Sequence, residues 1–545
     1  MPRLLFSVLP LALVSAAAPS PVFTPEAFRS HVAFLADDLL EGRDTGSRGH
    51  EIAARYVAAH FEALGLKPGG DKGSWYQQVT FQKTSPGASP GTLGLSGNGA
   101  AQSWTNGGDV VIGLDPQETK TDVSAPIVFV GYGLSEKSLG LDDYRGLNVK
   151  GKIVVTLRGY PKGLPSEVGA HLSSTKAEIA EAHGAIGMIS IDTLLSAKTR
   201  AWSVRQRGAS ASEFSWVGRD GKAHVEAPGI RAGAGVNDTV ANALFAGART
   251  SLAAIRAEAD RNNGRPKGFP LKGNVRITNE MVSERVTSPN VVGIMPGSDP
   301  KLSAQIVILS AHLDHIGISK PRPGDKPGAD RINNGALDNA SGIATMLEVA
   351  RAFATSPDKP RRTLVFLAST AEEKGLLGAD YYAQNPTVPL KDIVADVDLD
   401  MPLLLYPFTS VIAFGADHSE VGKVVADAAA PMGIALEADP MPQEGIFTRS
   451  DHYRFVQQGV PAVFLATGYA NGGAEQWEKF LGGNYHHPGD DLSQKIDWKS
   501  GARFAEVNYR ITRALADADE PPRWYQGDFF GNAFAPRAPK ASANR

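Results

Sequence analysis

The residues that could do chemistry gather in the C-terminal half of the chain, beside short apolar runs. An imidazole and a carboxylate follow the run at 306–309, and two glutamates follow the run at 363–368. Another carboxylate stands among small and amide residues directly before a helical pattern. Such side chains bind divalent cations or move protons. The candidates are His312, Asp314, Asp338, Glu372, Glu373, Asp400 and the pair His486-His487.

Each candidate also has an ordinary structural interpretation when it is taken alone. The His-x-Asp pattern at 312–314 is common in structural roles, although strand alternation would let the aspartate orient the histidine. Asp338 suits a helix cap as well as a metal ligand. The glutamates at 372–373 could form a solvated acidic loop, and a histidine pair in a loop is often incidental. The single segments leave both interpretations open.

Three aspartates alternate along one further run, at Asp396, Asp398 and Asp400, with apolar residues between them. Alternation places all three on one face of a strand. Three carboxylates on one face repel each other unless a counter-charge lies near. An exposed edge strand would also tolerate the pattern, so it is a second possible interpretation.

The composition limits the classes of partner and of metal. The chain has 545 residues, 42% of them hydrophobic and 21% charged, which is typical of a globular protein with two or three domains. A net charge of −3 gives no electrostatic case for nucleic acid or for an anionic membrane. Because there is no cysteine, a bound metal would have only nitrogen and oxygen ligands, which favours zinc, manganese, cobalt or magnesium.

Residues 1–18 are predicted to be a secretory signal peptide. Arg3 gives a positive start, an apolar run follows at 4–14, and small residues end the segment. The run is too short to cross a membrane, and the prolines behind it disfavour a buried helix. We therefore expect a periplasmic or extracellular protein, with no membrane span and with peptides as its expected partners; the sequence predicts no oligomeric state.

Strand and helix patterns alternate from Asn290 onward and predict an α/β fold. We expect a three-layer arrangement, with a mostly parallel sheet flanked by helices on both faces. A helical segment that begins at Thr24 is assigned to the same domain, which would be discontinuous and cover 22–104 and 271–534. In such sheets, binding sites form at the carboxyl ends of the strands.

Short apolar runs with one helical piece, at 176–183, predict a β-rich domain inserted at 105–270. The stretch 85–108 is rich in Gly, Ser and Pro and is interpreted as a linker or an exposed loop. The last segment, 535–545, has only small, proline, amide and basic residues and is predicted to be a disordered tail.

Taken together, two histidines and several acids at successive strand ends suit a pair of divalent cations that share one carboxylate. Such a pair activates a water molecule and polarises a carbonyl, while a carboxylate that binds no metal moves the proton. The expected chemistry is metal-assisted hydrolysis of an amide. The pattern Gly-x-Ser-x-Gly occurs at 87–91, but there it lies in a stretch rich in Gly, Ser and Pro and not between a strand pattern and a helix pattern, as a nucleophile elbow requires. The sequence has no phosphate-binding loop.

Six motifs follow one another in the C-terminal half of the chain. They are Ala311-His312-x-Asp314, Leu337-Asp338-Asn339-Ala340-Ser341-Gly342, Ala371-Glu372-Glu373-x-Gly375-Leu376-Leu377-Gly378, Leu399-Asp400-Met401, Ser450-Asp451-His452 and Tyr485-His486-x-Pro488-x-Asp490. In this order they resemble the motifs of the M28 family of di-zinc metallopeptidases, which includes secreted aminopeptidases and glutamate-carboxypeptidase-like enzymes. The segment around Val130-Gly131-Tyr132-Gly133 and 151–155 is similar to the protease-associated (PA) domain often inserted in that family.

The resemblance implies two zinc ions and gives each metal candidate a role. His312 and Asp400 would hold one zinc ion, and Glu373 and His486 the other. Asp338 would bridge the two ions, and its peptide bond to the next residue is expected to be cis.

The resemblance also implies the residues that act on the substrate. Glu372 would be the general base and acid, Asp314 would orient His312, and Tyr485 would stabilise the oxyanion. His486 is preferred to its neighbour on the same basis. Asp398 stands where many relatives have asparagine, which adds negative charge near the metals.

Three functions are compatible with the sequence. An aminopeptidase that removes N-terminal residues is the first, because acids near the metals suit a substrate's free ammonium group. A glutamate-carboxypeptidase-like enzyme is the second, with Arg449 as a possible carboxylate contact. A metal-free receptor-like binding protein is the third, and the intact ligand positions argue against it.

Overall fold

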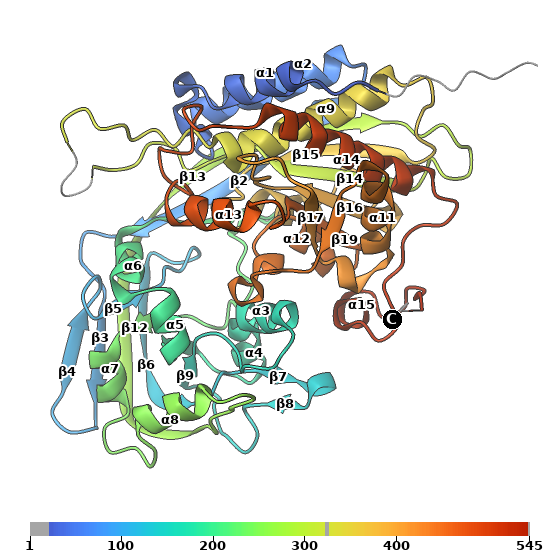
Figure 1. Cartoon of the computed structure of the whole chain (residues 1–545). Helices are drawn as coiled ribbons and strands as arrows, with labels where there is room; N and C mark the ends of the chain where they lie inside the picture. The colour runs from blue at the N-terminus through green and yellow to red at the C-terminus, as the bar shows by residue number, and fades with distance from the viewer. Residues whose placement is uncertain (1–20, 322–325, 543–545) are drawn as a thin grey trace, which may run out of the picture.

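The computed structural model describes residues 21–321 and 326–542 and has two lobes (Figure 1). The predicted signal peptide lies outside these residues. The long strand β13 (Phe269–Met295) links the lobes, because its first half pairs within one sheet and its second half within the other. We call the part formed by 87–280, apart from β11, the small lobe, and the remainder the large lobe.

The large lobe is built on a sheet whose central strands are parallel. Four neighbours run parallel in the middle, and antiparallel strands flank them on both sides. This is the mostly parallel α/β sheet that the sequence predicts. The strand order is β11 (Glu213–Trp216), β2 (Tyr76–Pro86), β13, β15 (Thr363–Ser369), β14 (Ile306–His312), β16 (Ile393–Leu399), β19 (Ala462–Thr467), β17 (Ser410–Phe414) and β18 (Ala435–Glu437), and β1 (Lys67–Pro68) extends the edge beside β13.

Helices cover both faces of this sheet, as predicted. One layer contains α1 (Pro25–Leu35), α2 (Arg48–Ala63), α9 (Ser341–Thr355), α11 (Glu420–Ala429) and α14 (Trp498–Asp517), four of which lie together at the top of Figure 1. The other layer includes α10 (Leu377–Gln384) and α12 (His452–Gln457). The remaining helices of the large lobe are α13 (Gly473–Gly482) and α15 (Phe529–Phe534).

Local sequence explains why these elements form where they do. Every residue of β14 is buried, as expected for a central parallel strand with helices on both sides. Asp497 caps α14 by accepting a hydrogen bond from the Lys499 amide, and the helix buries Phe504, Ile511 and Leu515 on one face. Each such apolar side chain contributes about 1.5–3 kcal/mol on burial.

The small lobe has a second sheet, with parallel strands in its middle. Its strand order is β4 (Gln102–Thr105), β3 (Thr92–Ser96), β13, β6 (Lys120–Phe129), β9 (Ile153–Leu157), β10 (Gly187–Ile191), β12 (Gly233–Val236) and β5 (Val110–Ile112), and β7 (Ser135–Glu136) and β8 (Leu141–Asp142) form a separate pair. Its helices are α3 (Ser166–Ser174), α4 (Lys176–Ala182), α5 (Leu194–Thr199), α6 (Trp202–Gln206), α7 (Asp238–Leu244) and α8 (Leu252–Ala259).

Two predictions for this region are wrong. The stretch 85–108 is not a linker, because β3 and β4 form within it and pair into the second sheet. Glycine and serine hide these strands from pattern analysis, since their apolar residues are few. The region 105–270 is also less β-rich than predicted, because several short helices accompany its strands. The domain boundaries and the PA-like assignment stay predictions.

The predicted disordered tail is ordered as far as the structure describes it. Ala541 is buried, and its amide donates to the Trp524 carbonyl over 2.9 Å. The Lys540 ammonium donates to the carbonyls of Gly531 (2.9 Å) and Ala535 (2.6 Å). A single small side chain and one cation fix the tail, and composition alone does not reveal such contacts. Among the helices within 21–321 and 326–542, none combines the length and the hydropathy that a membrane span requires.

Candidate metal centre

The candidate ligands meet at the carboxyl edge of the large-lobe sheet. His312 ends β14, the two glutamates follow β15, and Asp400 follows β16. In space β14 lies between β15 and β16, so three loops that are far apart in the sequence open onto the same edge. Asp338 lies in the turn Ala336–Ala340 directly before α9, and His486 lies in the loop after α13.

One group of donors consists of His312, Asp338 and Asp400. The His312 Nε2 atom is 3.1 Å from an Asp400 oxygen and 3.3 Å from Asp338 Oδ1. The opposite ring nitrogen, Nδ1, lies 3.1 Å from the backbone carbonyl of Asp314 and donates to it. That contact leaves Nε2 free to act as a ligand. Asp314 therefore orients the ring through its main-chain oxygen.

A second group shares Asp338 from its other oxygen. Asp338 Oδ2 is 3.3 Å from His486 Nε2 and 4.0 Å from His315 Nδ1. Glu373 contacts both histidines, His486 over 3.1 Å and His315 over 2.6 Å. The two oxygens of Asp338 thus face two different sets of donors, which is the arrangement expected of a bridging carboxylate.

His315 is absent from the sequence-based ligand set. It is fully buried and follows His312 by three residues. The sequence could have indicated this residue only as a second histidine close to His312. Its contact with Glu373 depends on how β14 and β15 lie side by side, which the chain order does not show.

The segment around Asp338 is held by hydrogen bonds to Asp490 and to Leu399. The amides of Leu337 and Asp338 donate to the Asp490 carboxylate over 3.0 Å each. The Asn339 amide group donates to the Leu399 carbonyl over 2.8 Å, which ties the turn to the end of β16. Gly342 permits this approach, because a Cβ atom there would lie 2.3 Å from the same carbonyl. The peptide bond between Asp338 and Asn339 is cis, as expected.

The donor set fits zinc. Ligand atoms of His312, Asp338 and Asp400 lie within 4.8 Å of one another, and so do those of His315, Asp338 and Glu373. Imidazole nitrogen and carboxylate oxygen are the ligands zinc takes when thiolates are absent. Burial disfavours the charged form of Asp338, but the surrounding histidines outweigh it and hold the pKa of Asp338 well below its usual range, so this carboxylate is ionised.

Comparison with known proteins agrees with this donor set. Residues 290–512 match the model described as Peptidase family M28. We call this matching part of the chain the M28 segment. The M28 segment contains every proposed ligand and most of the large-lobe sheet.

Curated relatives match parts of the chain. A probable zinc metalloprotease of Phaeosphaeria nodorum is 36% identical over 131 residues, which are 23% of this chain and 25% of that protein. A probable leucine aminopeptidase of Arthroderma benhamiae is 34% identical over 251 residues, which are 44% of this chain and 61% of that protein. The matches thus span from a quarter to about three fifths of these two relatives.

One solved structure shares the fold over almost the full length of both chains. The aminopeptidase from Aneurinibacillus sp. strain AM-1 aligns with a TM-score of 0.51 and 20% identity. The alignment covers 92% of this chain and 95% of that one. It therefore includes the small lobe as well as the M28 segment.

Glu372 faces the donors of the M28 segment without joining either group. Its Oε2 atom is 4.0 Å from His312 Nε2, and its backbone amide donates to the Asp314 carboxylate over 3.1 Å. Ala371 takes a left-handed conformation, with φ of 57°, which turns the chain sharply before the two glutamates. Burial, and after it the charges of Asp400 and Glu373, raise the pKa of Glu372 well above its usual range, although His312 opposes the shift.

The strand β16 carries further buried carboxylates close to the ligands of the M28 segment. Asp398 accepts hydrogen bonds from the hydroxyls of Ser450 (2.6 Å) and Ser310 (3.1 Å). Burial and the neighbouring Asp400 raise the pKa of Asp398 to about 7. The strand is central and not an edge strand, so the alternating aspartates are not explained by solvent exposure.

Arg43 is a second residue whose role the sequence does not reveal. Its guanidinium is buried and donates to the carbonyls of Leu313 (3.0 Å), Asn334 (2.5 Å) and Gly335 (3.1 Å). These carbonyls belong to the two loops that carry His312 and Asp338. Burial lowers the pKa of Arg43 to about 10, and it stays charged at neutral pH.

A cavity of about 320 Å³ opens above the two donor groups. Asp338, Glu372 and His486 reach its floor, and Tyr485 stacks on the His486 ring with centroids 3.8 Å apart. Met401, Phe464, Trp477 and Leu481 give it an apolar side. We call this space the catalytic cavity.

Proposed function

We propose that this protein is an exported zinc aminopeptidase that hydrolyses the N-terminal peptide bond of peptides. The observation that supports this best is the pair of donor groups that share Asp338, beneath a cavity of suitable size for one amino-acid side chain. Export rests on the predicted signal peptide.

His312, Asp338 and Asp400 would hold one zinc ion, and Asp338, Glu373 and His486 the other. When bound, the two ions would polarise the scissile carbonyl and lower the pKa of a water molecule. Their positive charge would also offset the repulsion between the four carboxylates that meet here, which are costly to bury without a counter-charge.

Glu372 would take a proton from the attacking water and deliver it to the leaving amine. Its position supports this role, because it faces the donors and is held at its backbone by Asp314. Its carboxylate belongs to neither of the two ligand groups found among the described residues. Tyr485, at the wall of the catalytic cavity, would donate a hydrogen bond to the oxyanion.

The same cavity supports recognition of a free N-terminus. Its acidic floor suits an ammonium group, and its apolar side suits a hydrophobic first side chain. We therefore expect leucine-like N-terminal residues to be preferred.

The test compares peptide anilides with a free amine and with a blocked one, after zinc loading. Hydrolysis of the free-amine compounds alone is expected. Hydrolysis of N-blocked peptides alone would reject the aminopeptidase function.

The role of Glu372 is tested by Glu372→Ala, which should keep bound zinc and lose about 10²–10⁴-fold in kcat. Glu478→Ala removes an exposed glutamate of α13 and is the matched control. A fully active Glu372→Ala protein would show that the base lies elsewhere.

A carboxypeptidase-like function is the second candidate. Arg449 lines the catalytic cavity with about half of its side chain exposed, and its ion pair with Glu444 is long, at 3.8 Å. A guanidinium in this position could bind a substrate's terminal carboxylate. A peptide with a blocked N-terminus and a free C-terminal carboxylate separates the two functions, because only a carboxypeptidase would release its last residue.

A further inference from the structure

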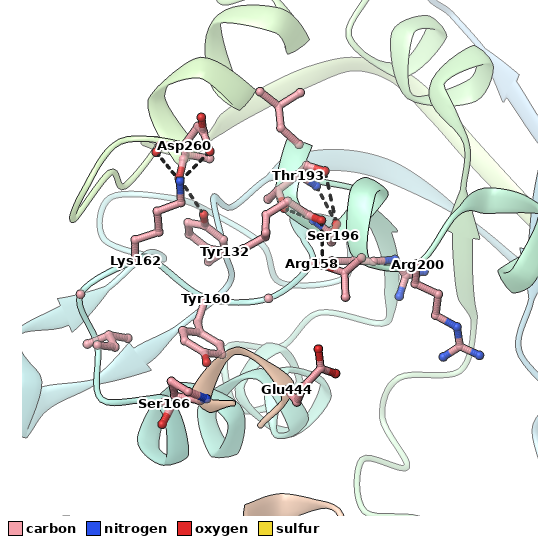
Figure 2. Close-up of a pocket in the computed structure, with 18 of the residues that line it drawn as sticks. Tyr132, Arg158, Tyr160, Lys162, Ser166, Thr193, Ser196, Arg200, Asp260 and Glu444 are labelled. Carbon is pink, nitrogen blue, oxygen red and sulfur yellow. Dashed lines mark hydrogen bonds and ion pairs between the residues drawn. The ribbon is translucent and has the colours of Figure 1, made fainter. Parts of the chain in front are cut away.

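The small lobe contains a cavity of about 560 Å³, which we call the small-lobe cavity (Figure 2). It lies at the carboxyl ends of β9 and β10, two adjacent parallel strands of the second sheet. Such strand ends are where α/β sheets form binding crevices. Pro442 and Glu444, from a loop of the large lobe, close the opposite side; Figure 2 shows Glu444 on the tan ribbon, facing Arg158 and Tyr160.

Arginines concentrate on one side of this cavity. Arg158 follows β9 and Asp192 follows β10, so the sheet brings them together. Arg158 Nε and Arg205 Nη2 both approach the same Asp192 oxygen, over 3.4 Å and 3.3 Å. The Ser196 hydroxyl also donates to that oxygen, over 2.8 Å. One carboxylate oxygen thus forms ion pairs with two guanidinium groups and accepts a hydrogen bond from one hydroxyl.

Positive charge remains in excess after these contacts. The buried Nε atoms of Arg158 and Arg205 have no hydrogen-bond partner in the described part of the chain. Arg200 lines the cavity, is exposed, and forms no ion pair with any residue in 21–321 or 326–542. On the far side Lys162 is balanced by Asp260, 2.7 Å away (Figure 2). The arginine side can therefore accept an anion.

The rest of the wall is apolar. Leu194 and Leu195 are each about half exposed and line the cavity beside Leu164, Tyr132 and Tyr160. Exposed leucines beside unsatisfied guanidinium donors suit a ligand with hydrophobic side chains and a carboxylate.

The small-lobe cavity adjoins the catalytic cavity. Glu444 lines both of them, and Met441 lines the catalytic cavity while the next residue, Pro442, lines the other. A peptide that places its N-terminus at the donor groups could therefore continue across this loop. This continuity favours a peptide over a free small anion.

We propose that the small-lobe cavity binds a carboxylate of the peptide substrate on the C-terminal side of the scissile bond, through Arg158, Arg200 and Arg205. The proposal rests on the proposed function. It makes the small lobe a substrate-selecting part of the enzyme, with a preference for peptides that have apolar residues and a free C-terminus.

The experiment uses pairs of leucine-initiated peptides of increasing length, each as free acid and as C-terminal amide. We measure kcat and KM with the zinc-loaded chain and dissociation constants with zinc-loaded Glu372→Ala. Above the length that spans the loop, the acid should bind roughly tenfold tighter than the amide, as charge-assisted hydrogen bonds predict. The difference should appear in KM and leave kcat nearly equal.

Arg205→Gln and, separately, Arg200→Gln should reduce the acid-to-amide ratio. Arg200 is exposed and has no ion pair among the described residues, so its removal does not endanger the fold. Arg145→Gln, which removes an exposed guanidinium elsewhere in the small lobe, should leave the ratio unchanged. Amidated peptides that contain an internal aspartate or glutamate test whether the small-lobe cavity also binds a side-chain carboxylate.

Equal affinity for acids and amides at every length, or a ratio unaffected by both cavity variants, would overturn the proposal. If no peptide is hydrolysed, the proposed function fails, and the dissociation constants still test the cavity by themselves.

Discussion

His418 forms a charged contact between the two lobes, and replacing it tests the electrostatics of that contact. The residue ends the turn Ala416–His418 after β17. Its Nε2 lies 2.5 Å from a Glu167 oxygen of α3, and its Nδ1 lies 2.6 Å from an Asp528 oxygen at the start of α15. The rings of Phe447 and Phe530 pack against it. Both ring nitrogens donate, so the imidazole is charged.

The size of the effect follows from the pKa of His418. Burial disfavours the charged ring, but the hydrogen bonds to Asp528 and Glu167 outweigh it and raise the pKa from 6.5 to about 10. The neighbouring ring of His452 is neutral, because burial, assisted by the charge of His418, lowers its pKa to about 3. With the pKa raised on folding, the stabilisation is complete below pH 6.5 and is lost as the pH rises through 10.

His418→Gln removes the charge and leaves two carboxylates without their partner. We expect a loss of about 3–5 kcal/mol in the free energy of unfolding near pH 6, the range measured for breaking buried ion pairs. Between pH 6.5 and 10 the difference from the wild type should shrink by about 1.4 kcal/mol per pH unit.

Urea unfolding of both proteins at several pH values measures this difference. His183→Gln is the control, because His183 is exposed and stacks on Tyr144 without an ion pair in the described residues. If the difference in the free energy of unfolding between His418→Gln and the wild type stays constant from pH 6 to 10, His418 is not charged in the folded protein. A loss no larger than that of His183→Gln would refute the importance of the contact.

Three further predictions concern the metal centre. Arg43→Met should destabilise the chain by about 3–5 kcal/mol, because buried carbonyls and carboxylates lose their cation, whereas the exposed Arg55→Met should cost under about 1 kcal/mol; equal thermal midpoints would contradict this. His315→Gln should weaken binding at one of two zinc sites by about 10–100-fold in chelator competition, since Glu373 loses its orienting partner, and unchanged affinity at both sites would reject that role. Removing zinc with a chelator should abolish activity and lower the thermal midpoint, both reversibly, and an unchanged midpoint would argue against a bound metal.

Sequence patterns suffice for the features that depend on neighbouring residues. The apolar run at 306–309 is a local pattern, and the strand β14 forms there. The absence of cysteine restricts the donors to nitrogen and oxygen, whatever fold the chain adopts. The ordered series of motifs also identifies the M28 segment.

Features that depend on contacts between distant residues have no such local signal. His315 lies in the same loop as His312, yet its relation to Glu373 depends on β15 packing beside β14. Arg43 is far from both loops in the chain and gives no pattern of its own. The composition after Phe534 predicts disorder, and this prediction is wrong for the described residues. The contact that holds the tail is made by one small residue, Ala541, with Trp524, and composition does not show such a contact.

The sequence by itself therefore determines which residue types could bind metal and that most of them stand at the end of an apolar run. Only the tertiary structure decides which of them meet. Spatial strand order, with β14 between β15 and β16, brings His312 close to Glu372 and to Asp400, which are 60 and 88 residues away in the chain. The small-lobe cavity has the same physical origin, because adjacent parallel strands bring Arg158 and Asp192 to one edge.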